Sequence, residues 1–236
     1  MQRYFATIEG LEDIGDILRY SSQVCLDQGA LRHSYHLTPQ FDAQVSDRVA
    51  VFAHGFSDAW LARYERSDFR KKDPIPDRVM RHGALLTWAD ARDAAPNTPD
   101  NENYFKAMDE EGLVHGFGLP LFGPRSRDAY AGFDFGRPIS EISNEALGVV
   151  RSVPQAAHQR VCILLESRDE VPVLSERETQ VMQWIVRGKS LGMIADILEI
   201  SPDTVKTYSK RIYAKLDCSD RVGATVAALK FGLVNV

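Results

Sequence analysis

The chain is 236 residues long, carries 28 Lys and Arg against 33 Asp and Glu, and has a net charge of −5 at pH 7. An acidic average argues against a nucleic-acid partner, because polyanions repel anionic proteins. The 44% apolar and 26% charged residues exclude a disordered chain, and no apolar run approaches the roughly 18 residues that a membrane span needs.

The first elements mix helical and strand periodicity. Apolar residues at helical spacing between Leu11 and Cys25 predict an amphipathic helix over residues 8–28. Residues 47–54 are rich in strand formers and predict a strand. Ser57 is placed to cap a following helix, and we expect a second short helix after Pro76.

A hairpin and a long helix complete the N-terminal part. Residues 114–122 and 129–135 are apolar and aromatic, and a turn-forming stretch separates them. Ser140 is placed to cap a helix that runs towards Leu165. This order predicts an α+β fold, an α/β/α sandwich in which helices cover an antiparallel sheet.

The charge divides the chain into two parts. Residues 173–236 hold nine basic and seven acidic residues, a net charge of +2, whereas residues 1–172 hold 19 and 26, a net charge of −7. A polar stretch ending in Pro172 lies between them. We therefore predict an N-terminal domain over residues 1–165, a linker over 166–172 and a C-terminal domain over 173–236.

The C-terminal domain carries clear helix boundaries. Ser175 and Glu178 form a capping box, and Gly188 is placed to end the first helix. Ser190 opens a second helix, and Ser201, followed by a proline, opens a third. With a fourth helix over residues 222–231, these signals predict a four-helix domain whose apolar residues point inward, namely Val181, Met182, Trp184, Ile185, Ile194, Ile197, Leu198, Val205, Ile212 and Leu216.

The third helix has a polar and basic outer face. Lysines on a surface helix usually mark only a solvated face, but a short helix, a tight turn and a capped basic helix are typical of a helix-turn-helix. The N-terminus of such a helix also attracts phosphate. Our candidate DNA-binding residues are Thr204, Lys206, Thr207, Lys210, Arg211 and Lys215, together with Lys189. The apolar fourth helix is suited to packing or dimerisation.

The C-terminal domain resembles the LuxR-type DNA-binding domain. The resemblance rests on Leu174-Ser-Glu-Arg-Glu178, on Gly188-Lys-Ser190 and on Ile194-Ala195 through Thr204-Val205-Lys206. Three residues depart from the family pattern: Met182 stands where Leu is usual, Met193 where Glu is frequent and Tyr208 where His is frequent. Met for Leu conserves volume, whereas Tyr208 leaves the operator preference open.

The same DNA-binding domain also occurs behind phospho-receiver domains, but the N-terminal part lacks their acidic cluster after an apolar strand. It resembles instead the acyl-homoserine-lactone-binding domain of quorum-sensing regulators. The matching residues are Trp60, Tyr64, Asp73-Pro74, Trp88 and Gly116, in the order of the family and close to its spacing. The resemblance thus extends over essentially the whole chain.

The resemblance implies a ligand-binding role for these residues. A lactone head group buries a ring carbonyl, an acyl carbonyl and an amide N–H, and each costs roughly 1–3 kcal/mol if it lacks a partner. By similarity, the Trp60 indole donates to the lactone carbonyl, Tyr64 serves the acyl carbonyl and Asp73 accepts from the amide. Trp88 and Gly116 form the pocket wall. Taken alone, Trp60 and Tyr64 are more often core aromatics and Asp73 a turn former.

Two pocket positions depart from the family. Phe56 stands where many relatives have Tyr, and Gly132 stands where relatives often have Ser or Thr. Loss of a side chain at Gly132 makes room and removes a polar anchor. We therefore expect an acyl group that is bulkier than short 3-oxo chains, or otherwise unusual.

Enzyme and metal chemistry have no support in the sequence. No nucleophile elbow or phosphate-binding loop is present, and the histidines have no clustered metal-binding partners. The cysteines, Cys25, Cys162 and Cys218, lack disulfide or zinc spacing and suit a reducing compartment. Residues 1–10 do not resemble a signal peptide. We expect no cofactor, no metal and no membrane association.

The sequence therefore predicts a cytoplasmic transcription regulator that is not an enzyme. The N-terminal domain binds an N-acyl-homoserine lactone, and the homodimer reads a two-fold symmetric DNA operator. Two alternatives stay open. The first is an orphan regulator of the same architecture that answers another small molecule. The second is an antagonist that acts by heterodimerisation with a partner regulator, without binding DNA.

Overall fold

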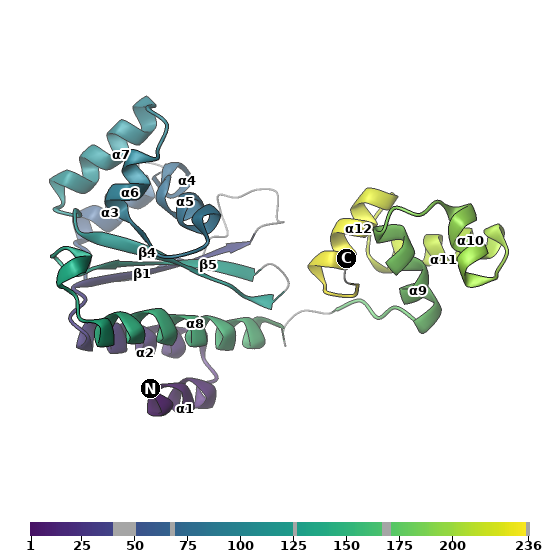
Figure 1. Cartoon of the computed structure of the whole chain (residues 1–236), viewed down its shortest axis with the longest axis horizontal. Helices are drawn as coiled ribbons and strands as arrows, with labels where there is room; N and C mark the ends of the chain where they lie inside the picture. Colours follow the sequence, from purple (N-terminus) through teal and green to yellow (C-terminus); the bar gives the residue numbers. More distant parts are fainter. Residues whose placement is uncertain (40–50, 67–68, 125–126, 167–170, 235–236) are drawn as a thin grey trace. The chain divides into compact units, whose positions relative to one another are not determined.

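The computed structural model describes residues 1–39, 51–66, 69–124, 127–166 and 171–234 (Figure 1). The chain forms two compact units, Met1–Ser167 and Arg168–Val236. Of the predicted linker 166–172, residues 167–170 lie outside the described residues. No helix in the described ranges is long and apolar enough to cross a membrane.

One antiparallel sheet organises the first unit. Within the described residues it has five strands in the order β2-β1-β5-β4-β3. The predicted hairpin is present as β4 and β5, and β2 is the described part of the strand predicted over 47–54, whose first four residues lie outside the description. The strand bounds are Arg32–Pro39 for β1, Val51–His54 for β2, Leu86–Thr87 for β3, Gly116–Leu121 for β4 and Arg127–Asp134 for β5.

Strand β1 was not predicted, because polar side chains lie on both of its faces. His33 and Tyr35 point into the apolar layer on one side of the sheet, where His33 is buried and stacks on Phe133 at 4.7 Å. Ser34 and His36 alternate with them and line a cavity on the other side. The strand therefore lacks the alternation of apolar and polar residues by which strands are recognised.

Helices α2 (Ile14–Asp27) and α8 (Asn144–Glu166) cover one face of the sheet, and α1 (Gln2–Gly10) packs against them on the side away from the sheet (Figure 1). The prediction of a single helix over 8–28 was wrong, because the chain is extended at Leu11 and Asp13 caps a new helix. The predicted cap at Ser140 was also wrong. Ser140 lies in a short 3₁₀ turn, and the Ser143 hydroxyl accepts from the Ala146 N–H at 3.2 Å.

Among the described residues, five shorter helices lie on the opposite side of the sheet, which completes the predicted α/β/α sandwich (Figure 1). A cluster of buried aromatic residues fills the space between these helices and the sheet, and it includes Trp60, Trp88, Tyr104 and Tyr130. The helices are α3 (Asp58–Arg66), α4 (Phe69–Lys72), α5 (Ile75–His82), α6 (Trp88–Asp93) and α7 (Pro99–Glu110).

The described part of the second unit is a four-helix domain, in which the first three helices begin where predicted and the fourth lies one residue earlier than the predicted 222–231. Its helices are α9 (Glu176–Val186), α10 (Leu191–Leu198), α11 (Pro202–Lys215) and α12 (Arg221–Lys230). Ser175, Ser190 and Ser201 cap the first three, and Gly188 has a positive φ of 78° after α9. Of the predicted inward residues, Ile197 is wrong: its side chain lies on the outer face of α10, 43% exposed, while Ile194 and Ala195 fill the core.

Candidate functional site

The aromatic cluster of the first unit encloses a cavity of about 50 Å³. It lies between the sheet and the layer of short helices, and strand, helix and loop residues line it. The lining includes five predicted ligand-binding residues, Phe56, Trp60, Tyr64, Asp73 and Trp88. The remaining lining residues are Ser34, His36, Ala53, Leu61, Ile75, Tyr104, Met108, Leu113 and Tyr130.

Asp73 is the acceptor at the centre of the polar groups in this cavity. Its Oδ2 accepts a hydrogen bond from the Tyr64 hydroxyl at 2.9 Å, and its Oδ1 accepts from the Ile75 N–H at 2.9 Å. Burial raises the pKa of Asp73 to about 6, although hydrogen bonds from Ile75, Tyr64 and Tyr104 act in the opposite direction. One carboxylate oxygen thus fixes the turn that opens α5, and the other faces the tyrosine.

Trp60 supplies an indole N–H to the same cavity. Helix α3 holds the residue, because the Ser57 hydroxyl accepts from the Trp60 backbone N–H at 3.0 Å, as expected of a cap. The ring packs against Tyr64, with ring centroids 6.0 Å apart, and is 5% exposed. Among the described residues, no hydrogen-bond partner is found for the indole N–H, so this donor is available to a ligand.

Trp88 and Gly116 form one wall, as the resemblance implies. A Cβ atom at Gly116 would overlap the Trp88 ring, so only glycine lets the indole lie against β4. The Trp88 Nε1 donates to the Tyr130 hydroxyl at 3.2 Å. Gly116 therefore acts behind the ring and does not itself line the cavity.

The space expected beside Gly132 is already filled. A Cβ atom at this position would lie 2.7 Å from the Tyr130 hydroxyl oxygen and 2.8 Å from the Ser34 hydroxyl oxygen. The absence of a side chain at Gly132 therefore leaves no free space for a ligand. The hydroxyl groups of Tyr130 and Ser34 supply polar atoms at this place. This corrects the premise from which we expected a bulkier acyl group.

Sequence reasoning missed four polar or aromatic residues of the cavity, namely Ser34, His36, Tyr104 and Tyr130. Tyr130 and Tyr64 both approach the His36 ring edge-on, with centroids 5.1 and 6.1 Å away. Two of the four lie on the unpredicted strand β1. Tyr130 lies in the predicted hairpin, where an aromatic residue gives no sign of facing a cavity.

In the second unit, helix α11 presents the predicted basic face. Lys206, Lys210 and Arg211 are exposed, and no ion pair from them to another described residue is found. The Thr204 hydroxyl is within hydrogen-bond distance of the Ser201 hydroxyl at 2.7 Å, and Thr207 donates to the Asp203 carbonyl at 2.9 Å. The N-terminal turn of α11 is thus ordered by its own hydroxyls, beside unpaired cations.

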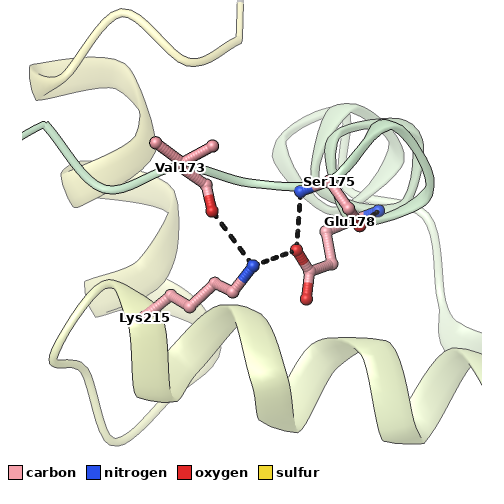
Figure 2. A network of polar contacts seen from close by, with 4 residues as sticks. All are labelled: Val173, Ser175, Glu178 and Lys215. Atoms are coloured by element: carbon pink, nitrogen blue, oxygen red, sulfur yellow. Dashed lines mark hydrogen bonds and ion pairs between the residues drawn. The ribbon is translucent and has the colours of Figure 1, made fainter.

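Lys215 differs from the other predicted DNA-binding residues. Its Nζ donates to the Glu178 Oε2 at 2.6 Å and to the Val173 carbonyl at 3.0 Å (Figure 2). The Ser175 N–H donates to the same carboxylate oxygen at 2.7 Å. Burial acts to raise the pKa of Glu178, but Lys215 and Ser175 hold it below its usual value. Lys215 thus joins the end of α11 to the start of α9, and we leave it out of the DNA interface.

Comparison with known proteins decides the family. The model described as an autoinducer binding domain matches residues 14–161, and the model of bacterial regulatory proteins of the luxR family matches residues 172–228. The quorum sensing-dependent regulator RpaR of Rhodopseudomonas palustris is 30% identical over 79% of this chain and 76% of its own length. The chain belongs to the LuxR family of quorum-sensing transcription regulators. The predicted resemblance of both domains is thereby confirmed.

Other members and solved structures agree with this LuxR-type assignment. The quorum-sensing regulator RhlR of Pseudomonas aeruginosa is 30% identical over 79% of the chain and 78% of its own length. The crystal structure of Escherichia coli SdiA has a TM-score of 0.71 at 20% identity, covering 100% of this chain and 98% of that chain. A structure of SdiA in complex with octanoyl-rac-glycerol has a TM-score of 0.69 at 18% identity, and the match covers 100% of this chain and 96% of that chain. These likenesses show that the fold is the LuxR-type fold.

Two departures from the LuxR pattern lie on α10 and α11 of the DNA-binding domain. Met193, in place of a frequent Glu, is 46% exposed at the start of α10. Tyr208 is half-buried and packs against the domain core from α11. Lys189, the remaining predicted DNA-binding residue, is half-buried in the turn between α9 and α10. Its backbone N–H donates to the Trp184 carbonyl.

Proposed function

We propose that this regulator binds an N-acyl-homoserine lactone in the cavity of its first unit. The observation that supports this most directly is that Trp60, Tyr64 and Asp73 meet at one cavity with three different hydrogen-bonding capacities. An indole only donates, an ionised carboxylate only accepts, and a phenol does both. A lactone head group offers two carbonyl acceptors and one amide donor, which these residues match.

Ligand binding exchanges one hydrogen bond of the free cavity. The Tyr64 hydroxyl has one proton to donate, and in the free protein it donates this hydrogen bond to the Asp73 carboxylate. When the amide N–H of the ligand donates to Asp73, the Tyr64 proton becomes available to the acyl carbonyl. The Trp60 indole N–H then donates to the lactone carbonyl. Each buried polar group of the head group thereby has a partner, which a dry site requires.

A thermal-shift panel tests the ligand. Homoserine lactones with butanoyl, octanoyl and dodecanoyl groups are compared with octanoyl-rac-glycerol, the ligand named for SdiA, which has no amide N–H to donate to Asp73. We expect stabilisation by at least one lactone, because a ligand that binds only the folded state raises its stability by mass action. Stabilisation by the acylglycerol alone would favour the orphan alternative, and no stabilisation by any lactone would contradict the proposal.

The second unit is proposed to read operator DNA through α11. Its capped N-terminus and the exposed Lys206, Lys210 and Arg211 provide donors and cations for phosphates and bases. Thr204 and Thr207 lie on the same helix, at its first two turns. Because the operator lies on bacterial DNA, we place the protein in the cytoplasm.

We further propose that the regulator acts as a homodimer. Helix α12 exposes Val222, Val226 and Leu229, at 72%, 40% and 37%, spaced four and three residues apart on one face. Such an exposed apolar stripe is suited to an identical stripe on a second copy. Binding of the purified protein alone to duplex DNA, in a salt-dependent manner, would exclude the antagonist that acts only by heterodimerisation.

A further inference from the structure

A row of small residues crosses the cavity side of the sheet. Strand pairing aligns Ala53 with Ser34, Ser34 with Gly132 and Gly132 with Gly118, across β2, β1, β5 and β4. Side chains in one such row lie on the same face of a sheet. Because none is larger than serine, the row forms a trough in the surface against which a ligand would lie.

The Tyr130 side chain lies in this trough. A Cβ atom at Gly118 would collide with the Tyr130 ring and with the Val79 Cγ2 atom, and one at Gly132 would lie 2.7 Å from the Tyr130 hydroxyl oxygen. The ring therefore covers both glycines, and Val79 covers Gly118 as well. Tyr130 lines the cavity, whereas neither glycine does. The ring therefore separates the cavity from the floor of the trough.

Two contacts hold the ring in this place. The Trp88 Nε1 donates to its hydroxyl at 3.2 Å, and the His36 ring meets it edge-on at 5.1 Å. Tyr130 is 3% exposed, so its position is fixed by packing on all sides. Trp88 is also the proposed wall beside the lactone, so the Tyr130 ring lies beside the space that the ligand would occupy.

We propose that Tyr130 is the residue that limits the size of the acyl group, so that the cognate ligand is a homoserine lactone with a short acyl group. This rests on the proposed function. The ring fills the part of the trough over Gly118 and Gly132, so an acyl group has no room there. The limit comes from the volume of the ring and not from its hydroxyl group.

Two variants of the full-length protein separate volume from hydrogen bonding. Tyr130→Ala opens the trough over Gly118 and Gly132, and an opened apolar cavity accepts apolar ligand groups. Tyr130→Phe keeps the ring and removes only the hydroxyl. Should the alanine variant not fold, as judged by circular dichroism and melting, Tyr130→Leu replaces it, because leucine is smaller than tyrosine and fills a core without a polar atom.

Calorimetric affinities for butanoyl-, octanoyl- and dodecanoyl-homoserine lactone provide the readout. We expect the wild type and Tyr130→Phe to bind the butanoyl lactone most tightly. In Tyr130→Ala the octanoyl lactone should bind best, since each additional buried methylene strengthens binding about four-fold.

The possible failures are distinguishable. If the wild type binds lactones but Tyr130→Ala keeps the wild-type order of chain lengths, or if the wild type binds the octanoyl or the dodecanoyl lactone more tightly than the butanoyl lactone, the role of Tyr130 is wrong. If Tyr130→Phe changes the order as Tyr130→Ala does, the hydroxyl and not the ring sets the limit. If the wild type binds no lactone, the proposed function itself fails, and this inference with it.

Discussion

Asp73 carries two tasks on its two carboxylate oxygens. Oδ1 accepts from the Ile75 N–H and fixes the turn before α5, while Oδ2 accepts from Tyr64 inside the cavity. The turn-forming role and the ligand-binding role, which compete in a reading of the sequence, are therefore compatible in the structure. A substitution that keeps the turn and weakens the second oxygen separates them.

Asp73→Asn is that substitution. Its amide oxygen can still accept from Ile75, but its NH₂ group then faces the ligand amide, so a charge-assisted hydrogen bond is lost. Such bonds contribute about 1.5–3 kcal/mol, which corresponds to an affinity weaker by about 10- to 150-fold. Calorimetry with butanoyl-homoserine lactone measures this loss of affinity. The melting temperature of the free variant should change little. A parallel loss of stability and affinity would make Asp73 purely structural.

The raised pKa of Asp73 also predicts how binding depends on pH. The ionised carboxylate accepts the ligand amide, so lactone affinity should fall as the pH decreases through about 6, by about tenfold at one pH unit below that value. The stability of the free protein depends on pH in the opposite direction to the lactone affinity. Burial disfavours the charged form, so this group's contribution to stability increases as the pH falls from about 6 towards 3.8. Affinities that stay constant between pH 5 and pH 7.5 would contradict this role.

The residues that sequence reasoning found and missed differ in a physical way. Trp60, Tyr64 and Asp73 lie close together in the chain, on neighbouring short helices and turns, so their local spacing was recognisable in the sequence. Tyr130 reaches the cavity by leaning across Gly132 and Gly118, and that position depends on strand register. No local pattern encodes such a contact.

At the level of the elements, the DNA-binding domain was the most predictable part. Its helix limits are set by local hydrogen bonds, such as the reciprocal bonds of Ser175 and Glu178, which sequence spacing reveals directly. The break between α1 and α2 was missed because α1 buries only Ile8 fully, so it leaves a narrow apolar stripe. The face of Ile197 was missed because periodicity alone does not show which neighbours cover a short helix.

Helix α11 predicts a difference between two of its lysines. Lys210 is exposed with no ion pair to another described residue, and Lys210→Ala should reduce the salt dependence of DNA binding by about one phosphate contact, with unchanged stability. The logarithm of the DNA affinity is measured against the logarithm of the salt concentration. An unchanged slope would remove Lys210 from the interface.

Lys215→Ala is the matched variant on the same helix. It leaves the buried Glu178 carboxylate without its cation, and we expect a stability loss of about 1–2 kcal/mol, reduced by the partial exposure of Lys215. Because the pKa of Glu178 is lowered, this contribution is present above its usual value of 4.5 and is lost as the pH falls through the lowered pKa. Urea unfolding at neutral pH measures the loss. A normal stability with a reduced salt slope would return Lys215 to the DNA interface.

For the whole molecule, the net charge of −5 concealed two different parts. The acidic residues belong mainly to residues 1–172, which carry −7, and the basic excess of +2 lies in the part that contains the helix-turn-helix. An acidic chain average is therefore compatible with DNA binding when the charges are divided between two compact units. The family membership could be predicted from the sequence, while the extent of the cavity and the proposal for Tyr130 needed the structure.

The central claim is that the cavity recognises an intact lactone head group, and one calorimetric comparison tests it most directly. Full-length protein is titrated with butanoyl-homoserine lactone and, separately, with its ring-opened form, N-butanoyl-homoserine. The lactone ring supplies a neutral carbonyl for the Trp60 N–H, whereas ring opening creates a carboxylate that must be buried near Asp73 at a large cost. We predict measurable binding of the lactone and at least about 100-fold weaker binding of the ring-opened compound. Equal affinities, or no binding of the lactone, would contradict the claim.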